Sequence, residues 1–126
     1  MQRYSTARAR SEDVQEMYFT VYPDFTNVDE FMEKYNTDRK FHRVFLRWAY
    51  FWENLGGLIK LGYVPIEFAA VSAGQARTII DAWERFRDII YRFRESGQRS
   101  KRDFDMWEYL YDSLIQYFEE HPELAP

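Results

Sequence analysis

The chain has 126 residues, the length of one ordinary domain, and a fifth of them are Phe, Tyr or Trp. It contains no cysteine, which excludes disulfides, thiolate nucleophiles and cysteine-bound zinc or iron–sulfur clusters. Its net charge of −4 disfavours nucleic acid and anionic membranes as partners. Because so many rings exceed what one core can hold, the composition favours an apolar or aromatic interface.

The start of the chain, MQRYSTARAR, is basic and no apolar run follows it, which is not the pattern of a secretory signal. No window approaches the 18 or so uncharged apolar residues that a membrane-spanning helix needs. We therefore expect a soluble cytoplasmic protein without membrane insertion.

Apolar residues recur at steps of three and four along the chain, which predicts helices and no sheet. The expected helices cover residues 5–20, 28–35, 38–61, 65–71, 73–95 and 103–120. Asn27 with Glu30, and Ser72 with Gln75, have the spacing of helix N-caps. The prediction is an all-α, single-domain bundle of five to six helices over residues 1–126, with both ends (1–10 and 121–126) frayed.

The helix at about 38–61 has the strongest apolar pattern. One stripe consists of Phe41, Val44, Phe45, Trp48, Trp52, Leu55 and Ile59, and a second, on another side, of Phe51, Leu58 and Leu61. A helix that is apolar over most of its circumference must be surrounded by protein. This helix is therefore predicted to be central, with helices 73–95 and 103–120 packed on it.

Two adjacent glycines, Gly56 and Gly57, interrupt the central helix. Each lowers helix stability by about 1 kcal/mol relative to Ala in a helix interior, so we expect packing contacts that need a residue without a side chain to offset this loss. The main interpretation is close approach of a neighbouring helix or ring. The alternatives are a hinge and a ligand held against bare backbone. A phosphate loop is excluded, because Tyr63 and Val64 stand where Lys and Ser or Thr are required.

Glu53 is a carboxylate within the most apolar helix, so it must be paired, protonated or at the rim. We expect a structural ion pair with Arg85 or Arg87. A raised pKa would alternatively suit an acid or base, but the sequence offers no second catalytic group. No catalytic, metal or cofactor motif is found, and neither His42 nor His121 has the spacing of a metal ligand.

Charge is unevenly distributed along the chain. Residues 92–102 carry +4 and residues 103–126 carry −7. The basic residues are Arg92, Arg94, Arg99, Lys101 and Arg102. The acidic segment can neutralise them within one molecule or across two; alternatively, the basic segment binds an anion, a nucleic acid or another partner.

Three segments resemble an uncharacterised family of small all-helical domains in bacteria and archaea. The likeness covers about two-thirds of the chain: an aromatic-Glu-x-x-Gly helix ending in Gly-Tyr-Val, a Trp-Glu-x-Phe-Arg helix and an aromatic-rich last helix. The matching residues are Glu53, Gly56, Gly62, Tyr63, Val64, Trp83, Glu84, Phe86 and Arg87. Gly57 and the pair Ala73-Gly74 depart from that pattern. The resemblance implies a helical bundle and brings no activity with it.

We expect a non-enzymatic protein–protein interaction or scaffold module that self-associates, with a homodimer as one form. The alternatives are nucleic-acid or anion binding through residues 92–102, and a small-ligand site or enzyme that uses Glu53. No cofactor is expected.

Overall fold

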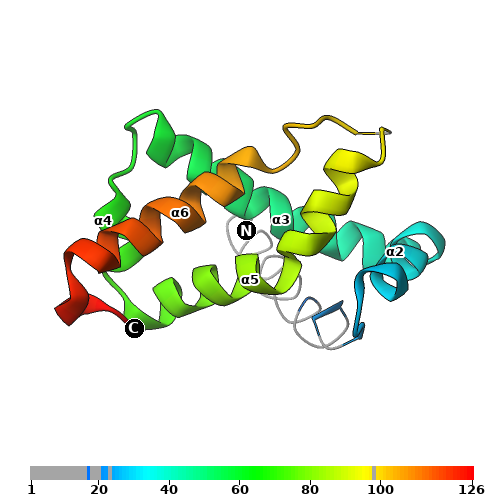
Figure 1. The fold of residues 1–126 in the computed structure, drawn as a ribbon, viewed down its shortest axis with the longest axis horizontal. Helices are drawn as coiled ribbons and strands as arrows, with labels where there is room; N and C mark the ends of the chain where they lie inside the picture. Colours follow the sequence, from blue (N-terminus) through cyan, green and yellow to red (C-terminus); the bar gives the residue numbers. More distant parts are fainter. Residues whose placement is uncertain (1–16, 18–20, 23, 98) are drawn as a thin grey trace, which may run out of the picture. The chain divides into compact units, whose positions relative to one another are not determined.

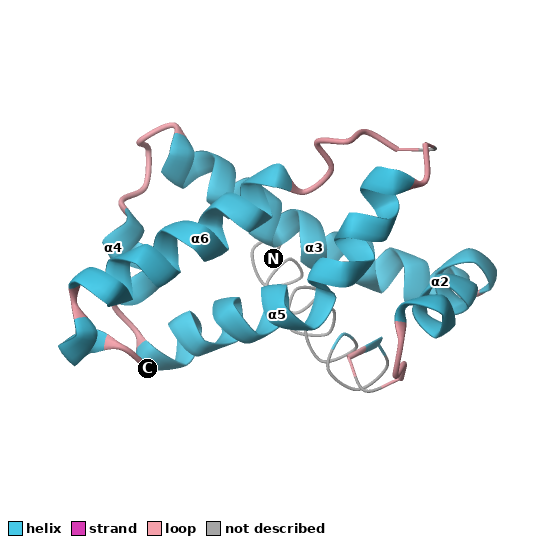
Figure 2. Cartoon of the chain, viewed as in Figure 1, coloured by secondary structure: helices cyan, strands magenta, loops and turns pink. Residues whose placement is uncertain are grey.

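A computed structural model describes residues 17, 21–22, 24–97 and 99–126. Within these residues there are five α-helices, one short 3-10 helix and no strand (Figures 1 and 2). Their bounds are α2 Val28–Thr37, α3 Arg39–Lys60, α4 Ile66–Ala70, α5 Ala73–Glu95, α6 Asp105–Glu120 and η2 Pro122–Leu124. The predicted all-α fold is confirmed. The helix expected at 5–20 and the frayed end at 1–10 fall outside the described residues, apart from Met17 within the former.

Local sequence signals determine where most helices begin and end. The side chain of Asn27 accepts a hydrogen bond from the Glu30 amide at 2.8 Å, and that of Ser72 accepts one from the Gln75 amide at 3.4 Å. Gly62, with φ of 82°, follows α3 in the left-handed conformation that glycine tolerates. These are the capping positions predicted from the sequence.

The chain divides into two compact units, Met1–Tyr50 and Phe51–Pro126. Helix α3 begins in the first unit and ends in the second. In the first unit the ring of Phe31 lies in an aromatic cluster. Its centroid is 5.1 Å from those of Phe25 and Phe41 and 4.9 Å from that of Phe45, with the rings edge to face. Such pairs add about 0.5 to 1.5 kcal/mol each beyond area burial.

In the second unit α4, α5 and α6 contact one another. Trp83 of α5 and Trp107 of α6 are fully buried, with ring centroids 5.4 Å apart. Seven apolar residues recur at steps of three and four along α5, and all are buried: Ala76, Ile79, Ile80, Trp83, Phe86, Ile90 and Phe93. The periodicity therefore identified the inward face of this helix.

Helix α3 differs from its prediction on one side. The first stripe is covered as expected, apart from the half-buried Leu55. The second stripe is exposed: Phe51, Leu58 and Leu61 have 58%, 44% and 73% of their surface accessible. The expectation that protein surrounds α3 is thus wrong for this face among the described residues, because α3 meets its neighbours in the second unit on the opposite side.

The C-terminal residues 121–126, which were expected to fray, contain a 3-10 turn and contact the preceding helices. The imidazole of His121 stacks on the ring of Tyr117, with centroids 4.4 Å apart. Pro122–Leu124 form the 3-10 turn, and the Arg77 guanidinium donates to the Pro126 carbonyl oxygen at 3.1 Å. These contacts fix the end of the chain to α5 and α6.

Candidate interaction surface

The N-terminus of α6 is the point at which the second unit is assembled. Its N-cap residue is Phe104, whose hydrocarbon ring cannot accept a hydrogen bond, and whose φ of 59° lies in the left-handed region. A helix start leaves up to four amides without an intrahelical partner. Their acceptor must therefore come from elsewhere in the fold.

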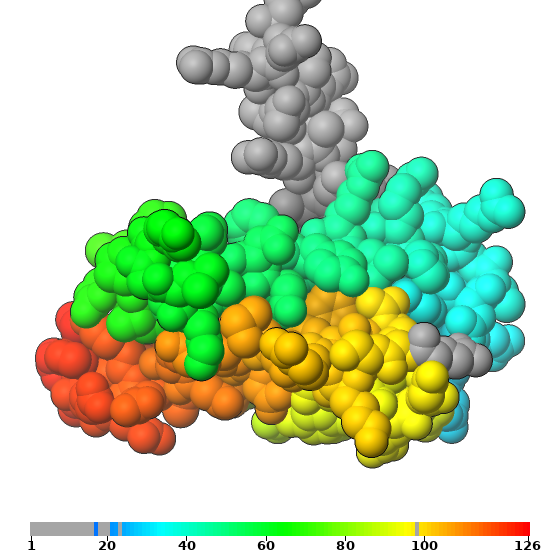
Figure 3. All heavy atoms as spheres, turned by 90° about the horizontal axis from the view of Figure 1, so that it is seen from above, coloured from blue at the N-terminus to red at the C-terminus, as the bar shows by residue number. Residues whose placement is uncertain are grey.

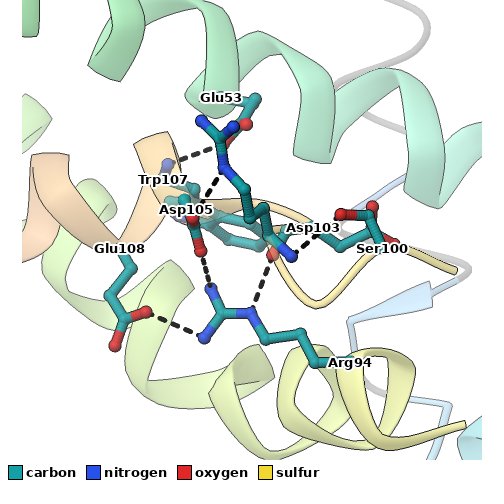
Figure 4. A network of polar contacts seen from close by, with 8 residues as sticks. Glu53, Arg94, Ser100, Asp103, Asp105, Trp107 and Glu108 are labelled. Carbon is teal, nitrogen blue, oxygen red and sulfur yellow. Dashed lines mark hydrogen bonds and ion pairs between the residues drawn. The ribbon is translucent and has the colours of Figure 1, made fainter. Parts of the chain in front are cut away.

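Glu53 of α3 supplies that acceptor. Its carboxylate accepts a hydrogen bond from the amide of Trp107 at 2.8 Å (Figure 4). Desolvation raises the pKa of Glu53 above its ordinary value, while hydrogen bonds from the amides of Trp107 and Met106 and the charge of Arg94 lower it. Asp105 adds to the rise. The residue occupies the role that Ser, Thr or Asp normally has as a local cap, from 54 positions away.

Gly56 lies one helical turn after Glu53, on the same side of α3. A Cβ at this position would overlap the carbonyl oxygen of Met106 and would lie 2.6 Å from its carbonyl carbon and 3.3 Å from Leu110 Cβ. Gly57 is different, because its Cβ would lie 3.8 Å from Met106 Cγ, an ordinary contact. The close approach therefore needs Gly56 alone, and the main chain of α6 occupies the space.

Arg94 of α5 holds the segment that leads into α6 (Figure 4). Its Nε donates to the carbonyl oxygen of Asp103 at 2.9 Å and its Nη1 to Glu108 at 2.9 Å. Its Nη2 lies 3.3 Å from the carboxylate of Asp105. The side chain is 16% exposed, so these charge-assisted bonds are partly shielded from water.

The groups that interact with Glu53 are not the arginines expected from the sequence. Among the described residues, the charged groups that shift the pKa of Glu53 are Asp105 and Arg94, and neither Arg85 nor Arg87 is one of them. Arg87 instead lowers the pKa of Tyr111, farther along α6. Glu53 interacts with α6 because its side chain faces the first turn of that helix, where the backbone amides lack intrahelical acceptors.

Much of the basic segment is engaged by acidic residues that follow it in the chain. Arg99 pairs with Asp103, and Arg102 with Asp105 at 3.7 Å. An open depression of about 540 Å³ is lined by Arg94, Glu95, Gly97, Arg99 and Lys101. Arg92 and Lys101 are exposed. The structure thus brings three of the five basic residues to one hollow, and two of these three already have carboxylate partners.

Exposed apolar side chains follow one another from the second half of α3 through the turn into α4, and we call these residues together the α3–α4 surface. It consists of Phe51, Leu58, Leu61, Tyr63, Phe68 and Val71, all more than a third exposed. Tyr63 is 78% exposed and Val71 is 81% exposed. In Figure 3 the end of α3 and the turn after it, in green, lie at the surface of the molecule. Large exposed apolar patches mark interaction sites in soluble proteins.

Sequence reasoning missed the exposure of this surface. The stripe of Phe51, Leu58 and Leu61 was visible, but a stripe covered by the same chain and one covered by a partner have the same periodicity. Tyr63, Phe68 and Val71 gave a further signal, because large apolar residues around the turn before Pro65 and through a five-residue helix have little room to be buried.

Within the described part of the chain, no group of three or more His, Asp or Glu side chains is placed to hold a metal ion. None of the described helices combines the length and the apolar character needed to cross a bilayer. No family model, curated protein or solved structure matches the chain. The resemblance to a family of small helical domains therefore stays a prediction.

Proposed function

We propose that this protein is a non-enzymatic interaction module that binds a protein partner through the α3–α4 surface. The observation that carries the proposal is the exposure of Phe51, Leu58 and Leu61 on a helix whose opposite face is firmly held. The other side chains of the surface, in the turn and in α4, are exposed as well. Leaving it in water has a cost of about 25 cal/mol per Å², which a partner would remove.

The area is large enough for recognition. The three exposed rings, of Phe51, Tyr63 and Phe68, present together roughly 400 Å² if each has about 200 Å² when fully exposed. The aliphatic side chains add to this. A stable interface buries about 800 Å² per partner, so the surface could form the apolar core of one, surrounded by a polar rim.

The two alternatives have weaker support. An anion entering the depression at residues 94–101 would have to displace carboxylates from Arg94 and Arg99, since both arginines are already paired. The carboxylate of Glu53 is occupied as a helix cap, and the depression is lined by other residues. Its raised pKa follows from burial at a helix junction and needs no catalytic role.

The experiment is site-specific photo-cross-linking in native extract. The photoreactive residue p-benzoylphenylalanine replaces Phe68 within the surface or, as the control, Leu124, a 50% exposed residue outside it. We expect a discrete protein adduct from position 68 that disappears when Leu61→Glu is added. Equal adducts from both positions, or none from position 68, would contradict the proposal.

A further inference from the structure

We infer that the partner is a second copy of this chain, joined by a two-fold interface in which the C-terminal half of α3 crosses its symmetry mate. This inference rests on the proposed function of the α3–α4 surface. It commits to one occupant, and charge, geometry and area on the described residues support that choice.

The two faces of α3 in the second unit are clearly divided. Successive residues of an α-helix are about 100° apart around its axis. Glu53, Gly56 and Lys60 share the face toward α6, as their contacts with Trp107, Met106 and the Tyr109 ring show. Phe51, Leu58 and Leu61 lie roughly 140° to 200° around the helix from Gly56. One face is fixed within the chain, and the other is available.

The charges of residues 51–71 suit a second copy. This range contains three charged residues, Glu53, Lys60 and Glu67. Glu53 caps α6, and the Lys60 ammonium lies 4.7 Å from the centroid of the Tyr109 ring, so both are directed to the α6 side. The exposed α3 face itself therefore lacks a charged side chain, Glu67 of α4 is the charge of this range that stays exposed away from α6, and two identical copies meet on α3 with little like-charge repulsion.

The acidic end of the chain is also kept apart in such a dimer. Residues 103–126 carry −7, and α6 lies on the side of α3 opposite the exposed stripe. With packed helices about 8 to 10 Å apart, two α3 helices in contact leave the two α6 helices roughly 25 Å apart. That separation is about three Debye lengths at physiological salt, so their repulsion is screened. A contact through α6 itself would bring these acidic segments together.

A two-fold axis has a natural place on this face. Phe51 and Leu61 lie about 15 Å apart along the helix, and Asn54 and Leu58, both exposed, lie between them. In an antiparallel crossing centred on Leu58, this side chain meets its own mate at the axis, Phe51 and Leu61 lie on either side of it, and each residue makes its contact twice. Close to the axis the two Cα atoms of position 58 would be roughly 4 to 6 Å apart, which is within disulfide range.

Sedimentation equilibrium on the purified full chain, from micromolar to millimolar concentration, tests the inference. We expect a monomer–dimer equilibrium whose dissociation constant rises about tenfold or more in Leu61→Glu and stays unchanged in Leu124→Glu. Both side chains are at least half exposed, so neither substitution should prevent folding. Circular dichroism checks this.

A symmetric disulfide gives a second readout. The chain has no cysteine, so Leu58→Cys carries one thiol, and under mild oxidation it should form a covalent dimer much faster than Leu124→Cys. A strict monomer at millimolar concentration, or a dimer that Leu61→Glu leaves intact, would overturn the inference. If that monomer still cross-links through position 68 to a different protein in extract, the proposed binding function is supported and self-association is contradicted. If position 68 gives no adduct either, both the proposed binding function and self-association are contradicted.

Discussion

At Gly56 one methyl group decides whether α6 can reach α3. The Cβ of Gly56→Ala would collide with the main chain of Met106, which cannot rotate away as a side chain can. We expect a loss of about 2 to 4 kcal/mol in the free energy of unfolding, measured by urea denaturation.

Gly57→Ala is the matched control. Its methyl group meets Met106 Cγ at an ordinary distance, and Ala favours the helix by about 1 kcal/mol, so this variant should be neutral or more stable. Equal destabilisation by both substitutions would show that the contact between α6 and Gly56 is wrongly placed.

Glu53 is expected to matter as an acceptor more than as a charge. Glu53→Ala removes the group that accepts from Trp107 at the first turn of α6 and should cost about 1 to 3 kcal/mol. Glu53→Gln keeps a carbonyl oxygen in the same place and should cost less than about 1 kcal/mol. Urea unfolding at neutral pH compares the two variants. A larger loss of unfolding free energy in Glu53→Gln than in Glu53→Ala would refute the capping role.

The pH dependence of stability follows from the raised pKa of Glu53. Folding raises this pKa above the ordinary value of 4.5, so the folded chain binds the proton more tightly than the unfolded chain. The part of the stability that depends on protonation of Glu53 is therefore fully present below pH 4.5 and is lost as pH rises through the folded pKa, while the hydrogen bond from Trp107 remains. The unfolding free energy of the wild type minus that of Glu53→Gln should fall from acid to neutral pH. A difference that rises over this range would show a lowered pKa.

At the scale of elements, the start of α6 depends on two other helices. Arg94 of α5 donates hydrogen bonds to Asp103 and Glu108 and forms an ion pair with Asp105, and a lysine cannot reproduce this planar fork. Arg94→Lys should cost about 1 to 3 kcal/mol and speed hydrogen exchange at the amides of residues 105–108. Arg87→Lys, an exposed change on the same helix, is the control. Unchanged exchange in Arg94→Lys would mean that the first turn of α6 is held without it.

Local signals explain why the elements were largely predictable. Ser72 caps α5, and that helix has the predicted bounds, Ala73–Glu95. Helix α6 begins at Asp105 and not at the predicted Asp103, because its cap is Glu53, a residue distant in sequence. Tertiary contacts of this kind leave no periodic pattern. The exposure of Leu58 and Leu61 could not be predicted either, since hydrophobicity does not say which molecule covers a residue.

At the scale of the whole molecule, the salt dependence of the dissociation constant distinguishes an apolar contact from an electrostatic one. Self-association through the α3–α4 surface buries almost no charge, so its dissociation constant should change less than about threefold between low and high salt. Binding of a polyanion by the basic segment would instead weaken steeply as salt rises. Sedimentation equilibrium at several salt concentrations measures the first, and retention on a polyanion column measures the second. A dimer that dissociates as salt rises would point to charged contacts.

The most direct test of the two-faced α3 is the rate of thiol labelling at single cysteines in this cysteine-free chain. In dilute solution Leu58→Cys, Leu61→Cys and Leu124→Cys should all react quickly, because all three positions are exposed. At high protein concentration the rates at positions 58 and 61 should fall while that at position 124 stays constant. Slow labelling of positions 58 and 61 in dilute solution, or rates there that do not change with concentration, would contradict the account.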